Sequence, residues 1–247
     1  MTGPDPANTG DSAGVPWQGR TLTPQPFAAD DGTASPVLAR ALAAGDVEQV
    51  ATALVEARVL VPVVAVLGDG PAPVGAHGRP VDAGADMAVA TLVAPDGARA
   101  LPVFSSAAAL TAWDAGARPV PAEGPRAALS AVQDGCVALV VDPGSPRPIV
   151  LPRPALWAVA QGRSWVPPER DPEVADAVSG AVDGLEEVAG VRLTAGEAGG
   201  LTVVLAVRQG LDAAQLSALL DDVRAGLARA DVLAERAESL ALNVVAA

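Results

Sequence analysis

From residue 36 onward the chain alternates short helical patterns with short apolar runs. Pro36 opens a helical pattern that Gly45 closes, and Asp46 can cap a second helix whose apolar residues recur every three or four positions. The run VLVPVVAVL at residues 59–67 is almost wholly apolar, which predicts a strand buried on both faces. A long loop rich in glycine and proline follows at residues 68–85. The pattern thus begins with two helices that lead into a buried strand.

The next segment predicts an antiparallel hairpin and then a helix. Residues 87–93 and 100–104 have strand patterns and are joined by a Pro-Asp-Gly turn. Either Ser105 or Ser106 can cap the helix that follows. A short connecting stretch at residues 118–121 then leads to the next helix.

The middle of the chain repeats helix and strand. Pro125 opens a helix, and the run CVALVV at residues 136–141 predicts another buried strand that ends in a turn at residues 142–144. Residues 148–151 can pair beside it, and Pro154 starts a further helix. We therefore expect an α/β (α+β) domain with a mixed sheet flanked by helices.

A second, smaller unit is predicted near the C-terminal end. The segment at residues 164–172 contains three prolines and several charges, as expected for a linker. Within residues 173–247, a helical pattern precedes strands at residues 191–197 and 201–208, and an amphipathic helix precedes a last strand at residues 240–245. This α-β-β-α-β order predicts a small ferredoxin-like α+β domain.

The first part of the chain has no periodic pattern. Residues 1–34 are rich in Pro, Gly, Asp, Thr and Ala, and we expect a disordered N-terminal arm, from which Trp17 or Phe27 can dock on the body. The arm has neither a basic n-region nor an apolar h-region, and no apolar run reaches the length of a membrane span. The expected organisation is thus the arm, an α/β domain at residues 35–163, the linker and the small domain, in a cytoplasmic protein.

Composition excludes several kinds of chemistry. All 16 basic residues are Arg, so phosphate-loop and Schiff-base enzymes, which need a lysine, are excluded. One Cys and one His are too few for a structural zinc site or a disulfide framework. The net charge of −13 opposes binding to nucleic acid and to anionic membranes. We expect no cofactor and no metal.

Isolated candidate residues give weak signals. The stretch GDGPAPVGAHG lacks the third glycine of a dinucleotide loop, because Pro73 stands there, and no clear helix follows it. His77 lies in the same stretch without a serine elbow nearby, and we interpret it as a solvated loop residue. Cys136 opens an apolar strand, so a core position is expected. A magnesium site assembled from distant carboxylates stays open as an alternative.

The most informative segment is LPVFSS, in which a strand ends at Phe104 and two serines precede a helix that contains Trp113. Junctions of this kind are where α/β folds gather free backbone N–H groups and place ligands. Asp142 ends another predicted strand, and if the two strands are parallel it lies at the same edge of the sheet. The candidate interaction residues are therefore Phe104, Ser105, Ser106, Trp113 and Asp142. The alternative is that the serines are structural caps and Trp113 packs in the core.

LPVFSSAAALTAW, followed by GCVALVVDPGSP, resembles the N-terminal domain of the enhanced serine sensitivity protein B (SseB) family. The matching positions are Leu101, Pro102, Val103, Phe104, Ser105, Ser106, Leu110 and Trp113, and then Gly135, Ala138, Leu139, Val140, Asp142 and Pro143. Ser105 stands where Thr is common and Asp142 where Asn is common. The resemblance covers about residues 37–160, and the last unit is similar to the second domain of longer, two-domain bacterial members.

The resemblance implies a cytoplasmic α/β protein and gives no catalytic residues to carry over. We therefore expect a non-enzymatic binding or regulatory module. The alternative is a small-metabolite binder or an enzyme that uses Ser105, Ser106 and Asp142. As partners we expect a protein or a second copy of the chain, without nucleic acid or membrane, and the sequence does not identify a small-molecule ligand.

Overall fold

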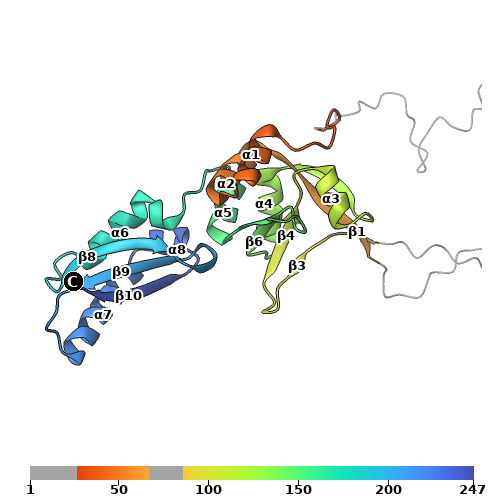
Figure 1. Ribbon diagram of the computed structural model, residues 1–247. Helices are drawn as coiled ribbons and strands as arrows, with labels where there is room; N and C mark the ends of the chain where they lie inside the picture. Colours follow the sequence, from red (N-terminus) through yellow and green to blue (C-terminus); the bar gives the residue numbers. More distant parts are fainter. Residues whose placement is uncertain (1–26, 67–85) are drawn as a thin grey trace, which may run out of the picture. The chain divides into compact units, whose positions relative to one another are not determined.

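The computed structural model describes residues 27–66 and 86–247 (Figure 1). By internal contacts the chain divides into Met1–Asp31 and Gly32–Ala247. The described part of the first unit is a turn in which the Asp30 N–H donates to the Phe27 carbonyl at 3.0 Å. Most of the predicted arm, with Trp17, lies outside the described residues, as does the predicted loop at residues 68–85 with His77.

The second unit begins with two helices that the sequence predicts. Helix α1 (Pro36–Ala44) ends at Gly45, whose φ of 70° is the left-handed conformation that glycine adopts most easily. Asp46 caps α2 (Val47–Glu56) and accepts hydrogen bonds from the backbone N–H and the side-chain amide of Gln49. These two bonds, the backbone bond first, hold the pKa of the Asp46 carboxyl below its usual range.

Before the C-terminal part the strands form two sheets, because a separate antiparallel sheet accompanies the mixed sheet that we expected. An antiparallel sheet has the order β2-β1-β5, and a mixed sheet has the order β3-β4-β6-β7 with β4 and β6 parallel. Helices together with mixed and antiparallel sheets make this an α+β fold. The strands are β1 (Arg58–Val66), β2 (Asp86–Val89), β3 (Leu92–Val93), β4 (Arg99–Val103), β5 (Arg118–Glu123), β6 (Ala138–Val141) and β7 (Ile149–Leu151).

The predicted single strand at residues 87–93 is wrong. It divides into β2, which pairs with β1, and β3, which pairs with β4. The Ala90 N–H still donates to the Pro62 carbonyl of β1 at 3.0 Å, and two residues later the chain pairs in the other sheet. The antiparallel hairpin of β3 and β4 is confirmed.

Two other strand predictions need correction. Val59 and Leu60 are buried, but Ala65 near the other end of β1 is exposed, so β1 is not buried on both faces along its length. Strand β6 alternates buried and half-buried positions, which places one of its faces in the core. The connecting stretch at residues 118–121 is part of β5, an edge strand in which proline is tolerated.

Helices α2, α4 and α5 pack on the mixed sheet and enclose the main core of the second unit (Figure 1). The remaining helices of this part are α3 (Ala107–Trp113), α4 (Gly124–Gln133) and α5 (Arg153–Ala160). A second, smaller cluster lies between β1 and α3 and consists of Leu60, Phe104, Leu110 and Ala117. This smaller cluster underlies the predicted site.

The C-terminal part has its own core beneath a three-stranded sheet of order β10-β9-β8. Its elements are α6 (Pro172–Val182), β8 (Val188–Ala195), β9 (Leu201–Val207), α7 (Ala213–Ala228), α8 (Asp231–Arg236) and β10 (Leu240–Ala246). Asp212 and Gln215 form the capping box of α7. The predicted order α-β-β-α-β is confirmed, with α8 added. The ferredoxin-like topology stays a prediction.

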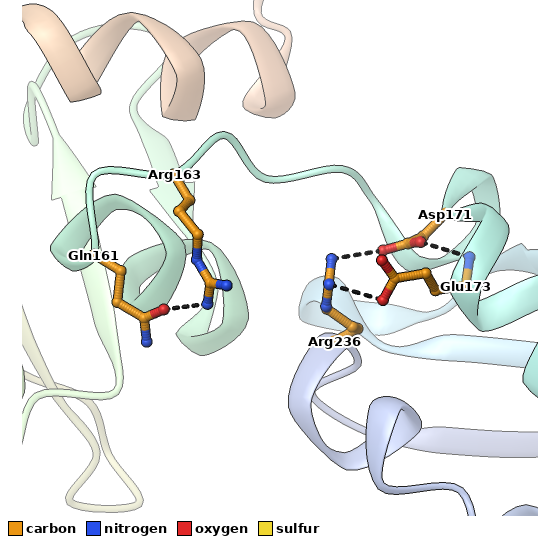
Figure 2. A network of polar contacts seen from close by, with 5 residues as sticks. All are labelled: Gln161, Arg163, Asp171, Glu173 and Arg236. Carbon is orange, nitrogen blue, oxygen red and sulfur yellow. Dashed lines mark hydrogen bonds and ion pairs between the residues drawn. The ribbon is translucent and has the colours of Figure 1, made fainter.

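The beginning of α6 is fixed by a buried carboxylate (Figure 2). Asp171 is 3% exposed, accepts a hydrogen bond from the Glu173 N–H at 2.9 Å and pairs with Arg236 at 3.0 Å. The same guanidinium pairs with the Glu173 carboxylate at 3.0 Å. Figure 2 also shows the contact between Gln161 and Arg163 just after α5. Asp171 belongs to the predicted linker and thus takes part in the fold of the C-terminal part.

Candidate functional site

The predicted site residues lie at one edge of the mixed sheet. Strands β4 and β6 are parallel, with Val103 opposite Val141, so their carboxyl ends meet at the same edge. This confirms the parallel arrangement on which the prediction depended. Phe104 and Ser105 follow β4, and Asp142 follows β6.

Ser105 and Asp142 are joined by two hydrogen bonds. The Ser105 N–H donates to Oδ1 of Asp142 at 2.8 Å, and the Ser105 hydroxyl donates to Oδ2 at 2.7 Å. Asp142 is held by its own N–H, which donates to the Val103 carbonyl at 2.9 Å. Since Ser105 is only 5% exposed, this carboxylate satisfies the polar groups of a buried serine.

Asp142 adopts an unusual backbone conformation. Its φ of 50° is the one positive value that the described residues show outside glycine. Aspartate is among the side chains that tolerate the left-handed region, and its two bonds to Ser105 stabilise it there. The turn after β6 therefore stores some backbone strain beside the serine pair.

Ser106 is the cap of α3, as predicted for one of the two serines. Its hydroxyl oxygen accepts a hydrogen bond from the Ala109 N–H at 3.2 Å. Ser105 has a different role, because its hydroxyl is used by Asp142. The two adjacent serines thus have separate roles: Ser105 binds Asp142 after the end of β4, and Ser106 caps the beginning of α3.

Phe104 and Trp113 form the apolar part of the site. Phe104 is fully buried, and its ring centroid lies 5.3 Å from that of Trp113 at an interplanar angle of 41°. The Phe104 N–H and carbonyl exchange hydrogen bonds of 2.9 and 2.8 Å with Leu60, which links the mixed sheet to the antiparallel sheet. Gly144, with φ of 85°, lies so close to Trp113 that a Cβ would sit 3.3 Å from its Cδ1.

Arg58 also holds the site in place, and we did not predict this role from the sequence. Its guanidinium donates to the Ser105 carbonyl at 3.0 Å and to the Thr33 carbonyl at 2.6 Å. A signal exists in the sequence: Arg58 is a single charge directly before a long apolar strand. Without the fold, however, nothing indicates which backbone groups it binds.

The polar side chains at this edge bind groups of the protein itself. The carboxylate of Asp142 accepts from Ser105 through both oxygens, and the Ser106 hydroxyl serves α3. Residues 27–66 and 86–247 contain no group of three or more His, Cys, Asp and Glu side chains arranged to hold a metal ion. The contacts that the structure shows at this edge are hydrogen bonds of Ser105, Ser106 and Asp142 and the ring contact of Phe104 with Trp113.

A profile of the family described as SseB protein N-terminal domain matches residues 37–158. This part of the chain is an SseB N-terminal domain. Searches of curated proteins and of solved structures found no match. The matched range contains α2 to α4, most of α1 and α5, both sheets of this part and all five predicted site residues, so the site is part of the SseB domain. In the described part of the chain, no helix has the length and apolar character needed to cross a bilayer.

Loss of either serine hydroxyl should destabilise the SseB domain, but to different degrees. Ser106→Ala removes a helix cap and should lower the free energy of unfolding by about 1 kcal/mol. Ser105→Ala leaves Oδ2 of Asp142 without its donor and should cost about 2 kcal/mol. Urea denaturation followed by circular dichroism measures both. Equal effects would show that the bond between Ser105 and Asp142 contributes no more than an ordinary cap.

The single cysteine of the SseB domain should be unreactive in the folded protein. Cys136 is 7% exposed, and burial raises the pKa of its thiol. We expect a thiol reagent at pH 7.5 to label the native protein at least ~100-fold more slowly than the urea-unfolded protein. In the native protein less of the thiol is ionised, and the reagent cannot reach the buried sulfur. Rapid labelling of the native protein would show that the segment before β6, which contains Cys136, opens to solvent.

Proposed function

We propose that this protein is a non-enzymatic binding or regulatory module of the SseB type that acts in the cytoplasm. The observation that carries the proposal is the internal use of the polar groups at the sheet edge. Both Ser105 donors bind Asp142, and Ser106 caps α3. A nucleophilic serine needs a base that can take its proton, and a carboxylate is a much weaker base than an imidazole.

The proposed recognition surface is the solvent side of this edge. Ser106, Trp113 and Asp142 are half-buried and present part of their surface, whereas Phe104 and Ser105 are buried beneath them. A partner would therefore touch the indole, the cap and the turn after β6, while Phe104 and Ser105 hold these groups in place. A half-buried Trp next to polar groups is typical of protein interfaces.

The second candidate function is a small-metabolite binder or an enzyme at the same edge. The left-handed Asp142 favours it, because strained residues outside glycine cluster at ligand sites. In that case a ligand would replace Ser105 as a hydrogen-bonding partner of the carboxylate.

Affinity capture with matched variants tests the proposal. Ala108 is exposed in the first turn of α3, two residues after Ser106, and Ala108→Arg places a large side chain next to this cap. Ala225→Arg adds the same side chain at an exposed position of α7. The expected result is a cytoplasmic protein that co-purifies with wild type and Ala225→Arg but at least tenfold less with Ala108→Arg. Mass spectrometry of the same samples also detects metabolites.

The outcomes separate the two candidate functions. A stoichiometric metabolite that is lost with Ala108→Arg, without a lost protein, favours the second candidate. If the two variants capture the same proteins and metabolites as wild type, the edge is structural and the proposed surface is wrong. Thermal unfolding of each variant shows that a loss of capture does not reflect a loss of fold.

A further inference from the structure

In the described part of the chain, no strand lies beside the outer edge of β10. Within the described residues its neighbouring strand is β9, to which it is parallel. The Ser239 carbonyl accepts from the Leu201 N–H at 2.8 Å, and the Ala247 N–H donates to the Val207 carbonyl at 2.9 Å. In a parallel ladder alternate residues face the neighbour, so odd-numbered residues bond to β9. The N–H and carbonyl groups of Leu240, Leu242, Val244 and Ala246 therefore face outward.

The two edges of this sheet differ in their protection against pairing. Strand β8, at the opposite edge, contains Arg192 and has a register shift between Val188 and Gly190. Charged residues and bulges are the usual means of keeping an edge strand unpaired. Strand β10 has the sequence LALNVVA over seven residues, without charge, proline or bulge. Strand β10 therefore has the properties of an edge strand that can pair with a further strand.

The side chains of β10 are apolar and incompletely covered. Leu240, Leu242 and Val244 lie on the face that bears the helices, and Leu242 packs against the core. Leu240 and Val244 are nevertheless each 41% exposed, because no further strand lies beside them in the described residues. A neighbouring strand with the same alternation would bury both.

We propose that β10 pairs antiparallel with β10 of a second copy of the chain, around a two-fold axis that passes between the two Asn243 residues. This register overlaps the whole strand and places Leu242 opposite Val244 of the other copy. It pairs even-numbered residues with each other, as the outward-facing backbone groups require. It also keeps the apolar faces of both strands on one side, so the two three-stranded sheets become one six-stranded sheet.

Charge favours a second copy as the occupant. The chain carries a net charge of −13, which opposes contact between two copies over most surfaces. Strand β10 is uncharged, so its pairing with itself brings no carboxylates face to face. The two Asn243 amides at the axis can donate and accept with each other.

The size of the contact indicates a weak dimer. An edge of seven residues is about 24 Å long and about 10 Å thick, so pairing buries on the order of 500 Å² in total over the two copies. This lies below the ~1,200 Å² of standard stable interfaces, so we expect a dissociation constant between micromolar and millimolar.

Sedimentation velocity of the full chain tests the association. Wild type should show a monomer–dimer equilibrium between ~10 µM and ~1 mM. Val244→Lys, which buries a charge in the dimer, and Val244→Pro, which removes an outward N–H, should each weaken association at least about tenfold. Val93→Lys, at a 66% exposed position of β3, is the matched control and should associate like wild type. Circular dichroism checks that each variant folds.

Cross-linking tests the register without relying on a disruptive variant. Antiparallel non-hydrogen-bonded pairs have Cα atoms about 4.5 Å apart, within the range of a disulfide. Asn243→Cys should therefore oxidise to a covalent dimer, whereas Arg192→Cys on the exposed part of β8 should not. The native Cys136 is buried and should stay reduced in both.

Several outcomes would overturn the proposal. One is a wild-type chain that stays monomeric at 1 mM with slowly exchanging amides at Leu242 and Val244, since the edge would then be covered by the chain itself. Another is a dimer that persists in both Val244 variants, because it would use a different surface. Equal cross-linking of Asn243→Cys and Arg192→Cys would also contradict the β10 register.

Discussion

Replacing Phe104 by alanine should lower the free energy of unfolding by about 4 kcal/mol, in the range measured for buried aromatic side chains. Phe104 is fully buried, contacts the Trp113 ring and belongs to the small cluster between β1 and α3. Its removal leaves a cavity where the two sheets of the SseB domain meet. Urea denaturation followed by far-ultraviolet circular dichroism gives the value.

The control for this substitution is Val93→Ala. Val93 is 66% exposed, and its truncation should change stability by no more than about 0.5 kcal/mol. A loss below about 1 kcal/mol for Phe104→Ala would show that the neighbouring side chains collapse into the space and that Phe104 is not needed to join the sheets.

Replacing Gly124 by alanine should destabilise the SseB domain by about 3 kcal/mol or prevent its folding. Gly124 begins α4, and its N–H donates to the Ala57 carbonyl at 2.9 Å. A Cβ here would overlap the carbonyl oxygen of Leu54 at the end of α2. Because backbone atoms oppose it, the strain can be relieved only by moving a helix.

Gly180→Ala provides the matched control in the same kind of element. Gly180 is an exposed residue of α6, with open space where a Cβ would be. Alanine at such a position should stabilise the helix by up to about 1 kcal/mol. The two substitutions should thus have opposite signs in thermal unfolding, and a neutral result at Gly124 would contradict the close packing of α2 against α4.

Local sequence signals predicted most elements of the described residues correctly, because caps and turns act over a few residues. The capping role of Asp46, the capping box at Asp212 and the hairpin before Phe104 all follow from neighbouring residues. The wrong predictions concern elements whose bounds depend on which strands pair with each other. The division between β2 and β3 depends on which strand lies opposite, and a periodic pattern carries no such information.

Strand β5 shows why a proline pattern misled the prediction. Pro119 and Pro121 suggest that no strand forms here, but both lie in an edge strand. On the outer side of an edge strand an N–H group would face solvent, so proline can stand there without loss of a hydrogen bond between strands. Whether a strand is at an edge or in the centre is a property of the whole sheet. It cannot be deduced from the residues of that strand.

The sequence predicted where the candidate site lies, but it did not predict most of the hydrogen bonds within the site. The LPVFSS segment and Asp142 could be placed at one edge once β4 and β6 were assumed parallel. That Ser105 binds Asp142, 37 residues away, while Ser106 caps α3 depends on the register between β4 and β6. The contact of Arg58 with the Ser105 carbonyl likewise depends on tertiary structure.

The pair of hydrogen bonds between Leu60 and Phe104 determines how the SseB domain can open. An amide hydrogen on an edge strand exchanges with solvent whenever that strand frays. The N–H group of Phe104 instead faces β1 from the other sheet and bonds to the Leu60 carbonyl at 2.9 Å, while the Leu60 N–H bonds back to the Phe104 carbonyl. These two hydrogens become accessible only when the sheets separate, so their exchange rate reports the cooperative opening of the domain and not the fraying of either sheet.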